Sequence, residues 1–240
     1  MKNSIFYLIT TLLVIVLCTG CEEPTFESQG ILTIMVIDIT DGEGTPVSNA
    51  TIKAYSDIEG WDFETNMKGQ YMTDTEGEIV ITDLTAGIYY LDIAKDNRNN
   101  WQYPLVIEVE DGDINGAYST IEENLNAYIS SASGISWEIV GISDSVGNDL
   151  SGNPSYSCAM GNVATFEKTG TYTLQDTGIT CDEASLVEGS WWGVGINSLM
   201  LLLDEGTTVV SHSVFSLQSN SFSATFFKND EYITYHYEKR

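Results

Sequence analysis

Four cysteines carry the most distinctive chemistry in this 240-residue chain, and two of them, Cys18 and Cys21, have the C-x-x-C spacing. That spacing serves redox chemistry when it opens a helix beside a sheet, where the helix dipole lowers the pKa of one thiol. Here the pair ends the apolar run 5–17 instead. A zinc site would need a second pair of ligands at suitable spacing, which Cys158 and Cys181 do not supply. We therefore predict neither a redox pair nor a zinc site.

The stretch DGDINGAYSTIE, residues 111–122, matches the calcium-loop pattern D-x-[DN]-x-[DN]-G-x5-E. The predicted oxygen ligands come from Asp111, Asp113, Asn115, the carbonyl of Ala117 and Glu122, with Gly116 at the sharp turn. The flanking sequence favours another interpretation. LVIEVE before the loop is typical of a strand, and the Asn-Gly pair also suits a hairpin turn. A calcium site at these residues is therefore an open hypothesis.

The chain has two histidines, His212 and His236, and both fall in alternating, strand-like segments. No G-x-S-x-G, H-E-x-x-H, P-loop or G-x-G-x-x-G motif accompanies them. Sequence alone does not select a carboxylate pair for glycoside hydrolysis from 35 acidic residues. We therefore expect no catalytic residues, no enzymatic activity and no cofactor.

The chain holds 35 acidic residues against 9 lysines and arginines, and its formal net charge is −26. Nucleic acid and anionic lipid surfaces bind clustered cations, so neither is expected as a direct partner. The first 20 residues contain one cation, Lys2, then the apolar run 5–17 and then small residues, which is the layout of a signal peptide. This run of 13 residues is shorter than the ~20 that span a bilayer, so a retained transmembrane helix is the less favoured alternative.

The segment LCTGC, residues 17–21, resembles the lipobox of bacterial lipoproteins, although Cys18 stands where leucine is usual. The resemblance implies that residues 1–20 are removed and that Cys21 carries diacylglycerol and further acyl chains such as palmitate, which anchor the protein in the membrane. Residues 21–28 form an acidic tether, which resembles the export signal of surface lipoproteins in the Bacteroidota group. The implied location is the outer membrane, with display at the cell surface rather than in the periplasm.

From residue 31 onward apolar residues alternate with a period of two, which predicts an all-β protein. The first predicted strands are 31–38, 51–56, 70–73, 77–84, 87–94 and 103–110. The segments GTPVSNATIKAY and TDTEGEIVITDLTAGIYYLDI resemble the Ig-like, prealbumin-like or carboxypeptidase-regulatory-like β-sandwich. The resemblance implies a non-catalytic spacer or interaction domain, which we assign to residues 29–126. Its predicted inward-facing residues are Ile79, Ile81, Leu84, Tyr89, Leu91 and Ile93.

Eight further strand-like segments follow residue 134, and such consecutive hairpins suit an up-and-down barrel. They are ISWEIVGI, NVATFEK, TYTLQD, EGSWWGV, SLMLLLD, TVVSHSVFSL, SFSATFF and YITYHYE. Trp137, TFEKTGTYTL, Cys181 and GSWWGV, in this order, resemble the small lipocalin-like domains of Bacteroidota lipoproteins. We therefore assign residues 127–133 to a linker and residues 134–240 to an eight-stranded lipocalin-like antiparallel barrel.

Cys158 and Cys181 are the remaining cysteines, and outside the membrane they can oxidise to a disulfide. Closing a loop of this length stabilises the fold by roughly 3 kcal/mol. Two free thiols are the alternative.

The lipocalin likeness implies a small hydrophobic ligand inside the barrel. The predicted lining residues are Trp137, Phe166, Tyr172, Trp192 and Leu201. Because strand residues alternate between faces, only one of the two adjacent tryptophans at 191 and 192 can enter the barrel. An interior filled by side chains is the alternative.

The favoured interpretation is a cell-envelope lipoprotein with a non-catalytic binding or structural role. The rival is a glycan-binding or adhesion accessory protein that uses exposed aromatic side chains such as Trp61 and Trp101.

Overall fold

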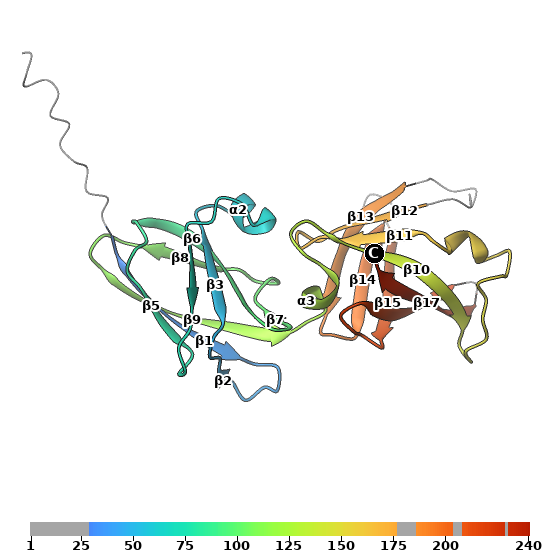
Figure 1. The fold of residues 1–240 in the computed structure, drawn as a ribbon, viewed down its shortest axis with the longest axis horizontal. Coiled ribbons are helices and arrows are strands. Elements are labelled where there is room, and N and C mark those ends of the chain that lie inside the picture. The colour runs from blue at the N-terminus through green and yellow to red at the C-terminus, as the bar shows by residue number, and fades with distance from the viewer. Residues whose placement is uncertain (1–28, 177–185, 204–207, 229) are drawn as a thin grey trace, which may run out of the picture.

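The computed structural model describes residues 29–176, 186–203, 208–228 and 230–240. These residues form a nine-stranded sheet followed by a closed barrel of eight strands, so the predicted all-β fold class is confirmed (Figure 1). The predicted signal peptide, Cys21 and the tether lie outside the described residues. None of the helices in the described ranges reaches the length and apolarity that crossing a membrane requires.

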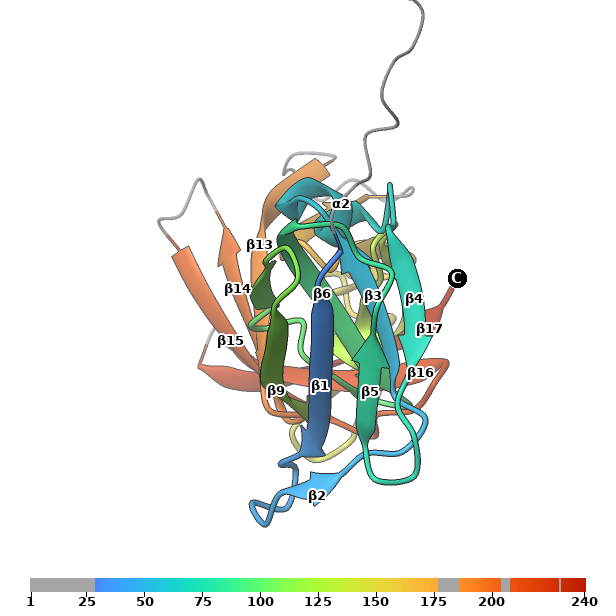
Figure 2. The same cartoon turned by 90° about the vertical axis from the view of Figure 1, so that its left-hand side faces the viewer.

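The first sheet is built around two central strands, each with three neighbours. Its strands are β1 (Ile31–Asp38), β2 (Thr45–Pro46), β3 (Thr51–Tyr55), β4 (Gly69–Met72), β5 (Glu78–Ile81), β6 (Gly87–Lys95), β7 (Arg98–Asn99), β8 (Leu105–Val109) and β9 (Ile114–Glu123). Strand β1 pairs with β2, β5 and, in parallel, β9, and Figure 2 shows it between β9 and β5. Strand β6 pairs with β3, β7 and β8, and β7 joins the two groups through β9.

Both groups of strands contribute to one apolar core. Five of the six residues predicted to face inward are buried there, namely Ile81, Leu84, Tyr89, Leu91 and Ile93. The sixth, Ile79, is partly buried and packs against the same core. The alternating pattern therefore predicted the inner face of these strands correctly, because only one face of each strand reaches the core.

Helix α2 (Ile58–Phe63) interrupts the strands, and the sequence pattern did not predict it. Its first turn is capped by Asp57, whose side chain accepts a hydrogen bond from the amide of Gly60 at 2.6 Å. It ends at Glu64, which adopts the left-handed conformation with φ 52°. The short helix buries Trp61 on one face.

The second sheet is a closed antiparallel barrel in which each strand pairs with the next, and the last strand pairs with the first. Its strands are β10 (Ile135–Asp144), β11 (Val163–Phe166), β12 (Thr171–Gln175), β13 (Leu186–Val194), β14 (Ser198–Leu203), β15 (Thr208–Phe215), β16 (Ser221–Lys228) and β17 (Glu231–Lys239). Each of the eight predicted segments overlaps one of these strands. A bulge between Ile139 and Gly141 adjusts the register of β10 against β17.

The segment between the sheets packs into the end of the barrel that faces the first sheet (Figure 1). Leu125 and Ile129, at helix α3 (Asn126–Ile129), are fully buried in the barrel's core. The Leu125 amide donates to the Gly195 carbonyl at 3.1 Å, and Trp137 Nε1 donates to the Ile129 carbonyl at 2.9 Å. Residues 127–133, which we expected to be a linker, therefore begin as part of the barrel's packing.

Candidate functional site

The barrel end that faces the first sheet, which we call the closed end, is filled by aromatic side chains. Phe166 lies 5.3 Å from Trp191 and 6.4 Å from Phe222 between ring centroids, and Trp137 lies 5.0 Å from Phe222. Trp137 and Phe166 are at most 1% exposed. These two predicted ligand residues therefore belong to the packed core, and they do not line the pocket described below.

Trp191, and not Trp192, is the tryptophan that enters the barrel. Trp191 is 3% exposed, whereas Trp192 is 40% exposed on the outer surface. The indole of Trp191 donates to the Glu167 carbonyl at 2.9 Å, and its backbone amide donates to the Gly170 carbonyl at 2.7 Å. The prediction of Trp192 as a ligand residue is therefore wrong. Alternation required one of the two tryptophans to face outward. The hydrogen bonds of Trp191 to the β11–β12 turn fix it as the one that faces inward.

The opposite end of the barrel, which we call the open end, contains a pocket of about 290 Å³. This volume lies at the lower edge of the ~300–1,000 Å³ that is usual for ligand sites. Its lining is mainly apolar and aromatic, and consists of Ile139, Tyr172, Leu174, Leu201, Leu203, Val210, His212, Phe226, Phe227, Lys228, Tyr235 and Tyr237. Of the five predicted ligand residues, the structure places Tyr172 and Leu201 in this pocket.

His212 is the most unusual group in the pocket, because it is a buried polar side chain without a complete set of partners. It lies on β15, is 6% exposed and packs against Phe226 with ring centroids 4.9 Å apart. Its Nδ1 is enclosed and has no hydrogen-bond partner among the described residues. Burial lowers the pKa of His212 to about 4, so the imidazole is neutral at neutral pH.

Three tyrosines complete the polar part of the pocket. Tyr172, Tyr235 and Tyr237 lie on β12 and β17, and all three line the cavity. Burial raises the pKa of Tyr235 to about 12 and the pKa of Tyr172 and Tyr237 still higher. These phenols therefore stay neutral and can donate hydrogen bonds. Neutral donors in an apolar wall suit binding, not proton transfer near neutral pH.

His236 differs from His212 because both of its ring nitrogens have hydrogen-bond partners. It lies on the outer side of β17, where its Nε2 is 3.0 Å from Ser143 Oγ and its Nδ1 is 2.9 Å from Ser223 Oγ. Both ring nitrogens have partners within the protein, so His236 has a structural role. The sequence pattern, which placed both histidines in strands, did not distinguish them.

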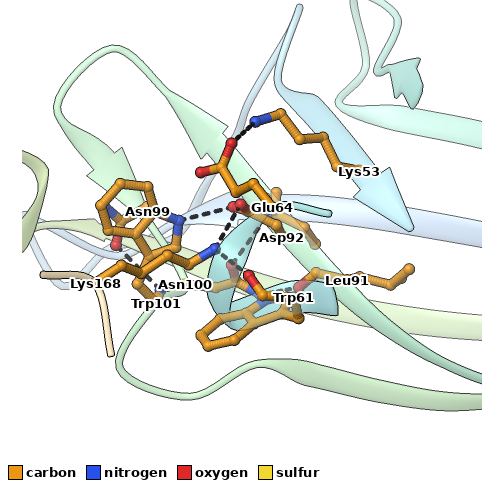
Figure 3. A network of polar contacts seen from close by, with 10 residues as sticks. Lys53, Trp61, Glu64, Leu91, Asp92, Asn99, Asn100, Trp101 and Lys168 are labelled. Atoms are coloured by element: carbon orange, nitrogen blue, oxygen red, sulfur yellow. Dashed lines mark hydrogen bonds and ion pairs between the residues drawn. The ribbon is translucent and has the colours of Figure 1, made fainter. Parts of the chain in front are cut away.

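At the closed end, Lys168 makes a second buried polar arrangement, shown in Figure 3. Its side chain is 0% exposed, and Nζ donates to Asp92 Oδ2 at 2.8 Å and to the Trp61 carbonyl at 2.9 Å. The ammonium lies 4.1 Å from the Trp61 ring and 5.0 Å from the Trp101 ring, which places it within cation–π range of both. We call these four residues the Lys168 cluster.

The Lys168 cluster joins the two sheets. Asp92 belongs to β6, Trp61 to α2, and Lys168 to the turn after β11, where Gly170 adopts a φ of 85°. Trp101 Nε1 donates to the second oxygen of Asp92 at 2.8 Å. Because the ammonium is held by a carboxylate, a carbonyl and two indoles, it is a structural cation and not a free nucleophile. Sequence reasoning missed the cluster, since its members are far apart in the chain and a hairpin lysine is ordinarily exposed.

Trp61 and Trp101, which the sequence offered as sugar-stacking residues, are both used in this cluster. Trp61 is 4% exposed and Trp101 is partly buried. These two tryptophans are therefore not exposed platforms for stacking on a sugar, which weakens the glycan-binding interpretation.

The structure does not bring the predicted calcium ligands together. Asn115, Ala117 and Glu122 lie in the extended strand β9. At about 3.3 Å per residue, Asn115 and Glu122 are roughly 23 Å apart, so they cannot bind one ion. Asp111 and Asp113 precede the strand, and within the described ranges no three His, Cys, Asp or Glu side chains form a group that could hold a metal. We therefore withdraw the calcium hypothesis.

Cys158 lies in a short 3-10 helix, η1 (Ser157–Ala159), in the loop between β10 and β11. It is partly buried and disulfide-bonded. Cys181 lies outside the described residues, so the pairing of these two cysteines stays a prediction.

Comparison with known proteins gives no family. No family model matches the chain, and neither does any curated protein. Among solved structures, the minor pilin GBS52 of Streptococcus agalactiae is 16% identical, with a TM-score of 0.32 over 40% of this chain and 45% of that one. The group B streptococcus pilus 2b backbone protein is 20% identical, with a TM-score of 0.30 over 39% of this chain and 41% of that one.

The shaft pilin SpaA from Lactobacillus rhamnosus GG is 10% identical, with a TM-score of 0.31 over 84% of this chain and 88% of that one. This chain spans less than half of the first two pilins. Because these TM-scores are low, the similarities do not indicate a function for this chain. Its function must be inferred from its own structure.

Proposed function

We propose that the protein is a lipid-anchored binding protein of the outer membrane, in which the open end of the barrel holds a small, largely apolar molecule. The observation that carries this proposal is the pocket of about 290 Å³, in which one buried histidine and three tyrosines interrupt an apolar wall. A concave apolar site with a few polar groups is the usual form of a small-molecule site.

The first sheet acts as a spacer in this proposal. Its contacts with the barrel are at the closed end, where Lys168 and Asp92 form an ion pair with Nζ and Oδ2 2.8 Å apart. The open end therefore stays clear of the first sheet. The glycan-binding alternative has less support, because Trp61 and Trp101 are used in the Lys168 cluster.

Native mass spectrometry of the protein purified from its own host tests the binding role. We expect an additional mass of a small molecule on the wild-type protein and its loss from Leu203→Phe, which places a larger side chain in the pocket. Trp192→Ala, on the outer surface, is the matched control and should retain the mass. Absence of any bound molecule from the wild-type protein would contradict the proposal.

The anchor is tested separately with Cys21→Ser. We expect this variant to stay uncleaved and to incorporate no labelled palmitate, whereas the wild-type chain is cleaved before Cys21 and labelled. Protease treatment of intact cells then distinguishes surface display from the periplasmic face. A mature N-terminus elsewhere than Cys21 would overturn the lipoprotein assignment without affecting the pocket.

A further inference from the structure

We infer that the pocket at the open end selects a neutral, planar ring compound with a hydroxyl or carbonyl oxygen, and that His212 recognises this oxygen. This inference rests on the proposed function and adds the chemical class of the ligand.

The first step concerns the ring nitrogens of His212. Nδ1 is enclosed by protein atoms and has no partner in the described part of the chain, which leaves Nε2 as the nitrogen that a ligand in the pocket can reach. A neutral imidazole carries its proton on one nitrogen, and an enclosed N–H without a partner is less tolerable than an enclosed lone pair. The proton therefore belongs on Nε2, which offers a donor to the ligand. Its natural partner is an acceptor oxygen.

The second step concerns the charge of the ligand. The ionisable groups that line the pocket are His212, Lys228 and three tyrosines, and Lys228 is exposed at the rim. Among the described residues that line the pocket there is no carboxylate, so a buried cation would find no counter-ion among them. A buried anion beside His212 would be surrounded by neutral donors, because Lys228, the cation in the described lining, is exposed to solvent at the rim. A neutral ligand avoids both desolvation penalties.

The third step concerns shape. Phe226 lies between His212 and Tyr235, with ring centroids 4.9 Å and 4.7 Å away, so flat faces and edges make much of the wall. Rings pack against such walls face to face or edge to face. The volume of about 290 Å³ suits a compact molecule of one or two rings and is too small to bury a long acyl chain completely.

Three matched probes test the inference on the wild-type mature chain at neutral pH. They are 2-naphthol, naphthalene and 2-naphthoate, which share one ring system and differ in the polar group. Fluorescence titration should show the tightest binding for 2-naphthol. Naphthalene should bind at least about tenfold more weakly, because it leaves the buried donor unpaired, and 2-naphthoate should also bind more weakly, because its charge must be desolvated.

The histidine variants assign the selectivity to one residue. His212→Phe keeps an aromatic ring beside Phe226 and should bring 2-naphthol and naphthalene to within about twofold of each other. His236→Phe changes the outer histidine, which is bonded to Ser143 and Ser223, and should keep the tenfold preference. The probe series on the wild-type chain remains decisive if either variant fails to fold.

The outcomes separate this inference from the proposed function. Equal affinity of the wild-type chain for 2-naphthol and naphthalene would overturn the role of His212 and leave the pocket as a binding site. Binding of none of the probes by a protein that retains a host molecule would overturn the ligand class alone. No probe binding and no retained molecule would overturn both.

Discussion

The two ends of the barrel have the same strand architecture and opposite interiors. At the closed end, Trp137 and Phe222 pack at 5.0 Å, and Ile129 from outside the barrel fills the remaining space. At the open end, the side chains line a pocket of about 290 Å³. The difference shows that the number of strands does not by itself decide whether a barrel of this size is filled by side chains throughout.

The buried polar groups at the two ends also differ, in how completely their hydrogen-bonding capacity is satisfied. Lys168 is fully buried and has a carboxylate, a carbonyl and two aromatic rings around its ammonium. His212 is buried with one enclosed nitrogen unpartnered in the described part of the chain. The buried charge of Lys168 is fully partnered and joins the two sheets, whereas the buried neutral imidazole of His212 keeps hydrogen-bonding capacity that the described residues do not use.

The largest expected effect comes from breaking the polar joint at the closed end. Lys168→Met keeps a long side chain between the tryptophans but leaves Asp92 buried without its cation. We expect the free energy of unfolding to fall by about 3–5 kcal/mol, measured by urea denaturation.

The double variant Lys168→Met with Asp92→Leu should recover most of this loss, since it removes both charges. Lys53→Met is the matched control, because Lys53 and Glu64 form a pair whose side chains are each 29% exposed. Its effect should be about 0–1 kcal/mol. A loss for Lys168→Met no larger than that of the control would show that the joint is not a stabilising feature.

The second expected effect is a dependence of stability on pH at the open end. The pKa of His212 lies near 6.5 in the unfolded chain and about 4 in the folded one, so between these values the unfolded chain binds more protons. Acid therefore favours unfolding: stability is lost as the pH falls from 6.5 towards 4, by about 3 kcal/mol in total.

The measurement is the free energy of unfolding at several pH values for the wild-type chain and for His212→Phe. Taking the difference removes the contribution of the carboxylates, which both chains share. A difference that does not change across this pH interval would argue against a buried neutral histidine.

A third effect compares added volume in the packed core of the barrel with added volume in the pocket. Ala224→Phe inserts a ring into the packed interior, where Ala224 is 1% exposed, and should cost about 1–3 kcal/mol by overpacking. Leu203→Phe places its ring in the open pocket and should change stability by less than about 1 kcal/mol while weakening 2-naphthol binding. Thermal denaturation of both variants checks the contrast. Equal destabilisation would mean that the pocket is as tightly packed as the core around Ala224.

The smallest expected effect concerns the adjacent tryptophans. Trp192→Ala removes a side chain that is 40% exposed and should change the free energy of unfolding by about 0.5 kcal/mol or less. Trp191→Ala removes a buried ring that packs on Phe166 and should destabilise the protein far more. Chemical denaturation of the two variants side by side tests the assignment of the inner face. Reversal of their order would show that β13 faces the other way.

Strand periodicity predicted much of the fold, including all eight segments of the barrel and the inner face of β6. It did not predict strands β2 and β7, which have two residues each, or helix α2, which depends on the cap at Asp57. Such short elements carry too few residues for a period to show. The calcium prediction failed because a sequence motif gives only the order of residue types. It does not reveal that the backbone at these residues is the extended strand β9.

The sequence by itself determined the alternation of inner and outer positions, and with it the all-β class. The same alternation required that one, and only one, of Trp191 and Trp192 face into the barrel. Alternation is a local property of the extended backbone, so a single strand displays it. Only the tertiary structure decided which tryptophan enters the barrel, that Lys168 pairs with Asp92, and which end of the barrel contains the pocket. Those outcomes depend on register and on contacts between residues distant in the chain, and no local pattern encodes them.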